Sequence, residues 1–286
     1  MRGYFLNYSF YNTKINFMTA NNSLHYDRIK TNWLACLPSG LADCFEVKDE
    51  LNIEPKRITG LVYRPSAEFI KEINKLKADN NLKKNAQLCW VMAIDDSNQF
   101  SPYFELRISN PLESIRLESS GVLNTIYYQK TFAFAKKHKG VTPNYRNEIC
   151  LNWGALPYSN FPDIFYTSVH YPDFSDMDKK ENIPLEMPQR LRECIIPFSD
   201  FAVLADDIIL NPNALIIVHL GISNLISGQY GVPFNPIIEV LSNPKGLSTS
   251  DEYMSFDDGY AKLIESDETE STDLDFVFYC PPNCPG

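Results

Sequence analysis

The 286-residue sequence predicts an α+β protein with largely antiparallel sheets that carry helices on one face. Three observations favour this class. Short apolar runs of strand length alternate with segments of helical apolar spacing, and paired runs are joined by polar turns. The same order of elements also recurs when the chain is compared with itself. The expected unit is strand, helix, strand, strand and a second helix, present twice.

The recurrence is seen at a shift of 133 residues, which places Pro55 on Pro188 and Arg57 on Arg190. Further matches at the same shift are Ile58 with Leu191, Val62 with Ile195, Ser66 with Ser199, and Ser109-Asn110-Pro111 with Ser242-Asn243-Pro244. Between these anchors the copies differ by compensating lengths, which loops absorb most easily. The sequence therefore predicts two pseudo-repeated units.

The elements of the first copy follow from local spacing. A helix is expected near residues 23–37, and the apolar run 58–63 has the length of a strand. Ser66 is expected to cap a helix whose apolar residues lie three or four positions apart. Runs 88–94 and 103–108 predict two strands joined by a polar turn, and residues 123–137 predict a second helix.

The second copy repeats this order. Its expected elements are a strand at 194–196, a helix capped by Ser199, strands at 215–222 and 237–241, and a helix at 251–265. Gly154 and several prolines break regular structure near residue 155. We therefore expect a first unit at 1–155 and a second at 156–286, with a single domain built on one continuous sheet as the alternative.

Charge is divided unevenly along the chain. The net charge of −10 argues against nucleic-acid binding, which needs clustered Lys and Arg. Residues 1–150 carry 20 basic and 15 acidic residues, or +5, whereas residues 151–286 carry 6 and 21, or −15. Opposite charge on two halves suits self-association or a partner with a basic face. Neither a signal segment nor a membrane span is predicted, which favours a cytoplasmic location.

Seven cysteines at irregular spacing predict mostly reduced thiols. Cys89, Cys150 and Cys194 lie in apolar runs and are expected in the core. The acidic stretch 265–275 is interpreted as a flexible connector before the tail residues Cys280 and Cys284. Those two thiols leave four alternatives open: a docked or exposed tail, a redox pair, a metal site that needs further ligands, and a recognition tail.

Common catalytic motifs are missing, including phosphate-binding loops, nucleophile elbows and His-Glu-x-x-His. A thiol at Cys36 or Cys44 could pair with His25 as a nucleophile and base, although a pair of structural thiols is the simpler interpretation. His219 lies in an apolar strand and is interpreted as a core histidine with satisfied hydrogen bonds. No cofactor is predicted, and a non-enzymatic function is favoured.

The aromatic, proline-punctuated segment 160–178 is the predicted binding surface, because long ordered loops rich in Tyr and Phe often contact partners. Its candidate binding residues are Phe161, Phe165, Tyr166, His170, Tyr171 and Phe174. The sequence thus predicts a macromolecular binding or assembly protein, such as an adaptor, inhibitor or structural component. The alternative is a redox-active, metal-binding or thiol-dependent protein that uses Cys280 and Cys284.

Overall fold

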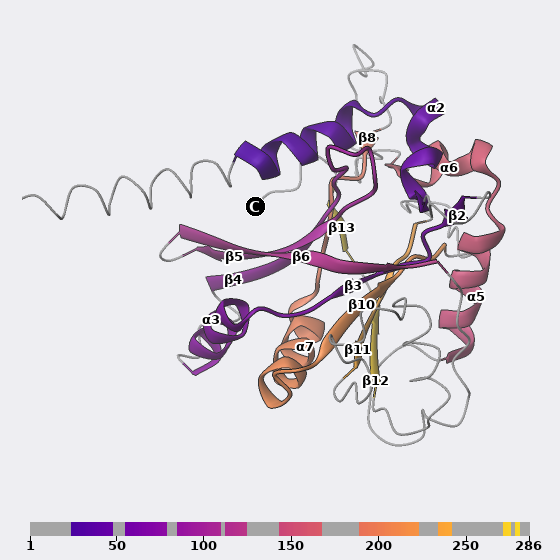
Figure 1. The fold of residues 1–286 in the computed structure, drawn as a ribbon. Coiled ribbons are helices and arrows are strands. Elements are labelled where there is room, and N and C mark those ends of the chain that lie inside the picture. The colour runs from indigo at the N-terminus through magenta and orange to yellow at the C-terminus, as the bar shows by residue number, and fades with distance from the viewer. Residues whose placement is uncertain are drawn as a thin grey trace, which may run out of the picture.

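A computed structural model provides the structure of the chain. It describes residues 24–47, 55–78, 85–109, 112–124, 143–167, 189–222, 234–241, 271–275 and 278–280. Helices and a large antiparallel sheet make up the fold, which confirms the α+β class (Figure 1). Within the described ranges, no helix combines the length and apolar character needed to cross a bilayer.

Nine strands form one curled sheet in the order β12-β11-β10-β3-β6-β5-β4-β9-β13, and every neighbouring pair is antiparallel. The strands are β3 (Gly60–Tyr63), β4 (Ala86–Val91), β5 (Tyr103–Ser109), β6 (Leu112–Leu123), β9 (Glu193–Ile195), β10 (Leu215–His219), β11 (Ile237–Leu241), β12 (Ser271–Asp275) and β13 (Phe278–Cys280). Two short ladders lie apart from it, β1 (Glu46–Val47) with β2 (Lys56–Arg57) and β7 (Tyr166–Thr167) with β8 (Gln189–Arg190).

The sheet combines blocks of strands from both halves of the chain, with β3-β6-β5-β4 of the first half between β12-β11-β10 and β9-β13 of the second. β3 pairs with β10, and β4 pairs with β9, so each half inserts its first strand beside the hairpin of the other. Segments 1–155 and 156–286 therefore share one sheet, which is the arrangement that the sequence left open as the alternative.

Two helices connect the exchanged strands. α3 (Ala67–Ala78) joins β3 to β4, and α7 (Phe198–Leu210) joins β9 to β10; the two lie side by side on one face of the sheet (Figure 1). The Oγ of Ser66 accepts a hydrogen bond of 3.1 Å from the Phe69 amide, which confirms Ser66 as a cap. Ser199 is not a cap: α7 begins at Phe198 with Pro197 as its N-cap, so Ser199 lies inside the helix.

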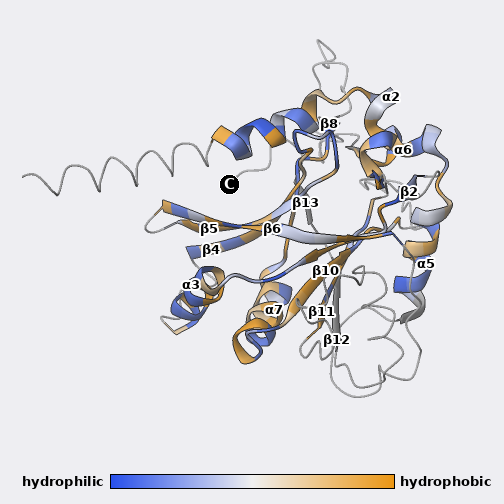
Figure 2. Cartoon of the chain, viewed as in Figure 1, coloured by the Kyte–Doolittle hydropathy of each residue, from blue (hydrophilic) through white to orange (hydrophobic). Residues whose placement is uncertain are grey.

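The core lies between the sheet and these helices. Alternate strand residues such as Trp90 and Phe104 face it and are fully buried. On the opposite face, the helix at 24–35 packs Ile29 on β4 and β5, and α5 (Pro143–Ala155) packs Ile149 on β11. The expectation that helices cover only one face is therefore wrong, since both faces of the apolar strands need cover. Figure 2 shows the apolar character of α7, β10 and β11.

Two further expectations are corrected by the strands. The 12-residue strand β6, the longest described, was not predicted, and it reaches residue 123, where a helix was expected to start. The remainder of that helix and the predicted helix at 251–265 lie outside the described residues, apart from residue 124. Residues 271–275 of the acidic connector form β12, because their backbone pairs along the whole of β11. Cys89, Cys150 and Cys194 are buried and form no disulfide with one another, as predicted.

Candidate functional site

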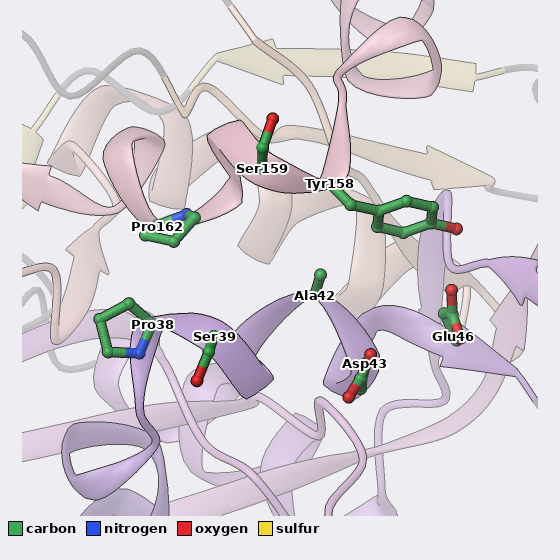
Figure 3. A pocket seen from close by; sticks show the side chains of 8 residues that line it. All are labelled: Pro38, Ser39, Ala42, Asp43, Glu46, Tyr158, Ser159 and Pro162. Carbon is green, nitrogen blue, oxygen red and sulfur yellow. The ribbon is translucent and has the colours of Figure 1, made fainter.

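An open pocket of about 470 Å³ lies between two pairs of short helices (Figure 3). One wall consists of α2 (Pro38–Leu41) and η1 (Ala42–Phe45), and the other of η2 (Tyr158–Asn160) and α6 (Phe161–Ile164). The pocket is lined by Pro38, Ser39, Ala42, Asp43, Glu46, Tyr158, Ser159 and Pro162.

Proline shapes both walls in the same way. Leu37 and Pro157 each hold an extended backbone immediately before a short helix, with ψ of 148° and 141°. Pro38 opens α2, and Pro162 lies in the first turn of α6, where the missing amide hydrogen of proline costs no helical hydrogen bond. Each wall therefore begins with an extended residue that is followed by a short helix.

The pocket carries negative charge. Its lining includes the carboxylates of Asp43 and Glu46, two serine hydroxyls and the phenol of Tyr158, and none of the described residues that line it is Lys, Arg or His. Burial, and then the hydrogen bond with Glu46, raise the pKa of the Tyr158 hydroxyl. A site of this composition suits a cationic ligand.

Arg57 packs against the wall that carries Tyr158 and Phe161. Its guanidinium carbon lies 4.5 Å from the ring centre of Tyr158 and 4.8 Å from that of Phe161. The same group donates hydrogen bonds to the backbone carbonyls of Trp153 at 2.8 Å and Gly154 at 3.1 Å. Arg57 therefore fixes α6 and Tyr158 relative to β2.

The two walls also share a sequence pattern, which is not among the matches found at a shift of 133 residues. Residues 32–45 read NWLACLPSGLADCF, and residues 152–165 read NWGALPYSNFPDIF. With one unmatched residue in each stretch, Cys36 and Tyr158, the identical positions are Asn, Trp, Ala, Leu, Pro, Ser, Asp and Phe. The signal that could have found the pocket is thus the repeated Asn-Trp-x-Ala.

The two motifs make reciprocal contacts with the opposite halves of the chain. The indole nitrogen of Trp33 donates to the Leu191 carbonyl at 2.7 Å, and that of Trp153 donates to the Ile58 carbonyl at 2.8 Å. Arg190 donates to the Trp33 carbonyl, just as Arg57 donates to that of Trp153. Each tryptophan is therefore anchored to the short ladder that follows the other motif.

Side-chain amides and rings complete this correspondence. Asn32 and Asn152 each donate a 3.2 Å hydrogen bond to a backbone carbonyl, that of Ile94 and that of Ile222 respectively. Where the motifs meet, the rings of Phe45 and Phe165 stack with their centres 5.4 Å apart and an interplanar angle of 13°. The pocket walls are therefore built on a shared aromatic core.

The predicted binding segment starts at the pocket, but its first aromatics face inward. Phe161 and Phe165 are both 0% exposed and pack in the aromatic core, so their rings are not on the surface. Tyr166 begins β7. His170, Tyr171 and Phe174 lie outside the described residues. A binding role for the segment stays a prediction, and Tyr158, which was not predicted, is the aromatic that lines the pocket.

The cysteine candidates lie in different places. Cys280 is in β13, where its backbone pairs with Glu193, and Cys284 falls outside the described residues. Among the described side chains no group of three or more His, Cys, Asp or Glu could hold a metal ion. The metal or redox role of that pair stays a prediction. The Sγ atoms of Cys36 and Cys44 lie 3.9 Å apart, whereas the His25 ring contacts Arg28 and Tyr26.

His219 is a buried histidine in hydrogen bonds, as interpreted from the sequence. Its Nε2 lies 2.7 Å from Arg146 Nη2 and 2.7 Å from Glu239 Oε2, and those two atoms are 3.0 Å apart. Burial, and then the charge of Arg146, lower the pKa of His219 to about 4, although Glu239 opposes this. The cluster ties α5 to β10 and β11.

Comparisons of the chain with known protein families, with curated proteins and with solved structures found no match. The pocket lining offers the carboxylates of Asp43 and Glu46 and the hydroxyls of two serines and Tyr158 as polar contacts for a ligand.

Proposed function

We propose that this protein binds another protein and that the pocket receives a Lys or Arg side chain of that partner. The observation that carries the proposal is the presence of the Asp43 and Glu46 carboxylates in an open pocket whose described lining residues include no Lys, Arg or His. A guanidinium can donate hydrogen bonds to two carboxylates at once, which gives both orientation and charge compensation. This narrows the predicted binding function to a partner with a basic face.

Size and overall charge support the same function. About 470 Å³ lies within the range of pockets that enclose a small ligand or a protruding side chain. The chain carries a net charge of −10, which would steer a basic partner toward it and reduce binding as salt rises. The exposed ring of Tyr158, at 45%, adds apolar area for the aliphatic stem of the bound residue.

We also infer that the two halves descend from one duplicated unit. The order β3-α3-β4-β5-β6 has a counterpart in β9-α7-β10-β11-β12, and the sheet contains the blocks β6-β5-β4-β9 and β12-β11-β10-β3. The recurring motif at 32–45 and 152–165 supports the same origin. On this view the pocket lies between two related motifs. Tyr158, which lines the pocket, has no counterpart in the first motif, so the two walls differ at this position.

The pocket proposal is tested by NMR titration of the labelled full chain. The probe is a short peptide with one central arginine, and the control is the same peptide with citrulline, a neutral isostere. We expect saturable shifts at residues 38–46 and 158–162 with the arginine peptide alone. The double variant D43N/E46Q should weaken binding at least about tenfold, since charge-assisted hydrogen bonds are lost. Equal shifts with citrulline, or none with arginine, would overturn the proposal.

Self-association is distinguished by mass measurement of the native protein at low and high salt. The +5 and −15 halves would give an oligomer that dissociates as salt rises, because exposed charges are screened. If such an oligomer forms and D43N/E46Q dissociates it, the partner's basic residue comes from a second copy of this chain. If the oligomer persists in that variant, the pocket is not its contact.

A further inference from the structure

Two thiols of the first motif lie in contact beside the pocket. The Sγ atoms of Cys36 and Cys44 are 3.9 Å apart, and both cysteines are free. At their positions the second motif has no thiol, since Cys36 has no counterpart and Ile164 stands where Cys44 would be. The second motif therefore folds without a pair of thiols, which indicates that the thiols of the first motif are not needed for its fold.

The two thiols differ in their surroundings. Cys44 is fully buried, and its Sγ lies 3.5 Å from the Gly40 carbonyl and 3.7 Å from Asn98 Oδ1. Cys36 is half-buried, and its Sγ lies 3.6 Å from the Leu37 carbonyl. Burial, and then the neighbouring Cys36, raise the pKa of the Cys44 thiol to about 12, so it stays protonated at neutral pH. An oxidant from solvent reaches Cys36 first.

We propose that Cys36 and Cys44 form a reversible disulfide. A disulfide requires an S–S distance of about 2.05 Å, so the two sulfurs must approach by roughly 2 Å, which side-chain rotation and a small shift of the short helices can supply. Within the segment between them, a Cβ placed on Gly40 would meet no atom within 4 Å, so α2 borders open space at this point. The bond would close a ring over residues 36–44.

The reaction balances with a small-molecule disulfide, such as glutathione disulfide, as the oxidant. The Cys36 thiolate attacks one sulfur of the oxidant, which forms a mixed disulfide and releases one thiol. Cys44 then gives up its proton and attacks Cys36 Sγ, which forms the intramolecular bond and releases the second thiol. The cysteines lose two electrons and two protons, and the oxidant is reduced to two thiols.

The ring contains one wall of the pocket. Pro38, Ser39, Ala42 and Asp43 lie between the two cysteines. Closing the bond would move these residues relative to Tyr158 on the opposite wall. Oxidation should therefore change the affinity for the arginine peptide, a consequence that rests on the proposed function, whereas the disulfide itself does not.

The bond is tested on the full chain carrying C280S/C284S, which removes the tail thiols. The protein is equilibrated with reduced and oxidised glutathione, acid-quenched and alkylated, then digested with trypsin and with a protease that cleaves before aspartate. Trypsin leaves both cysteines in the peptide 31–48, and cleavage before Asp43 separates them. We expect fragments 31–42 and 43–48 to remain joined until a reductant is added.

Single variants show whether the two-step route is followed. C44S should stop at the mixed disulfide on Cys36, and C36S should form neither product. Both thiols remaining alkylatable in fully oxidised glutathione, or a mixed disulfide that persists in the parent protein, would overturn the proposal. If the bond forms while the arginine peptide binds neither state, the pocket proposal fails and the disulfide stands. If both states bind equally, only the link between them fails.

Discussion

The indole N–H of Trp153 donates a 2.8 Å hydrogen bond to the carbonyl of Ile58, a residue that lies 95 positions earlier in the chain. Both groups are buried, and Trp33 makes the equivalent bond of 2.7 Å to Leu191. These bonds fix the two motifs that form the pocket walls against the start of the exchanged strands β3 and β9.

Replacing either tryptophan by phenylalanine should lower the free energy of unfolding by about 1–3 kcal/mol, because a buried carbonyl loses its donor. Trp33→Phe and Trp153→Phe should cost similar amounts, since the contacts are equivalent. Equilibrium urea unfolding measures both. The exposed neighbour Leu34, at 43%, provides Leu34→Ala as a control with little effect. A change in either tryptophan variant no larger than that of the control would contradict this.

Gly221 and Gly40 form a second matched pair. A Cβ at Gly221 would lie 2.6 Å from the Asn235 carbonyl and 2.9 Å from the Ile149 side chain, whereas one at Gly40 meets nothing within 4 Å. Gly221→Ala should therefore destabilise the fold by roughly 1–3 kcal/mol through overpacking. Gly40→Ala should be neutral or stabilise slightly, since alanine is the better helix former. Thermal melts of the two variants should move in opposite directions or differ clearly in size.

The two serines aligned by the sequence should behave differently. Ser66→Ala removes the hydrogen bond to the Phe69 amide and should cost about 1 kcal/mol of stability. Ser199→Ala lies inside α7, where its exposed hydroxyl hydrogen-bonds the neighbouring Asp200, and should cost less than about 0.5 kcal/mol. Urea midpoints of the two variants provide the measurement, and equal losses would show that Ser199 caps α7 in solution.

Stability should depend on pH through His219. Its pKa of about 4 in the folded chain lies below the ordinary value of 6.5, so between these values the unfolded chain binds a proton that the folded chain does not. The free energy of unfolding should therefore fall as pH falls from 6.5 to 4, by up to about 3 kcal/mol. His219→Gln should flatten this part of the profile, measured by urea unfolding at several pH values.

The control for that experiment is Leu34→Ala, which changes an exposed side chain without a titratable group. It should leave the difference between pH 6.5 and pH 4 close to that of the parent protein. If the free energy of unfolding of the parent protein does not change between pH 6.5 and pH 4, then protonation of the Arg146–His219–Glu239 cluster does not destabilise the fold, and the prediction is wrong.

Local patterns in the sequence predicted much of the fold. The helical spacing after Ser66 gives α3, the run 237–241 gives β11, and the apolar surroundings of Cys89 place it in the core. β6 was missed because the predicted strands are apolar runs, whereas in β6 the inward residues Ile115 and Leu117 alternate with Arg116 and Glu118, the pattern of a half-buried strand. In the folded chain Arg116 donates a hydrogen bond to Glu105, and Glu118 accepts one from Tyr26, so both charged side chains have partners on that face of the sheet.

The pocket was not predicted, because its walls lie about 120 residues apart and the Asn-Trp-x-Ala repeat that marks both of them falls outside the matches at a shift of 133 residues. Bringing them together depends on the pairing of β3 with β10 and β4 with β9, which no local pattern encodes. The many aromatic residues around Phe161 and Phe165 were compatible with either a binding surface or a buried core. Interfaces and cores favour the same rings, and only burial distinguishes them.

The exchange of first strands has a consequence for the chain as it is synthesised. When residues up to 123 have emerged from the ribosome, β3-β6-β5-β4 can pair, but β3 and β4 remain open edges. Trp33 still lacks its acceptor, which is 158 residues further along. Both edges are covered by β9 and β10, which α7 joins, so neither edge can be closed before these later strands have been synthesised. Long-range pairing of this kind slows folding, and open strand edges can pair with other chains in the meantime.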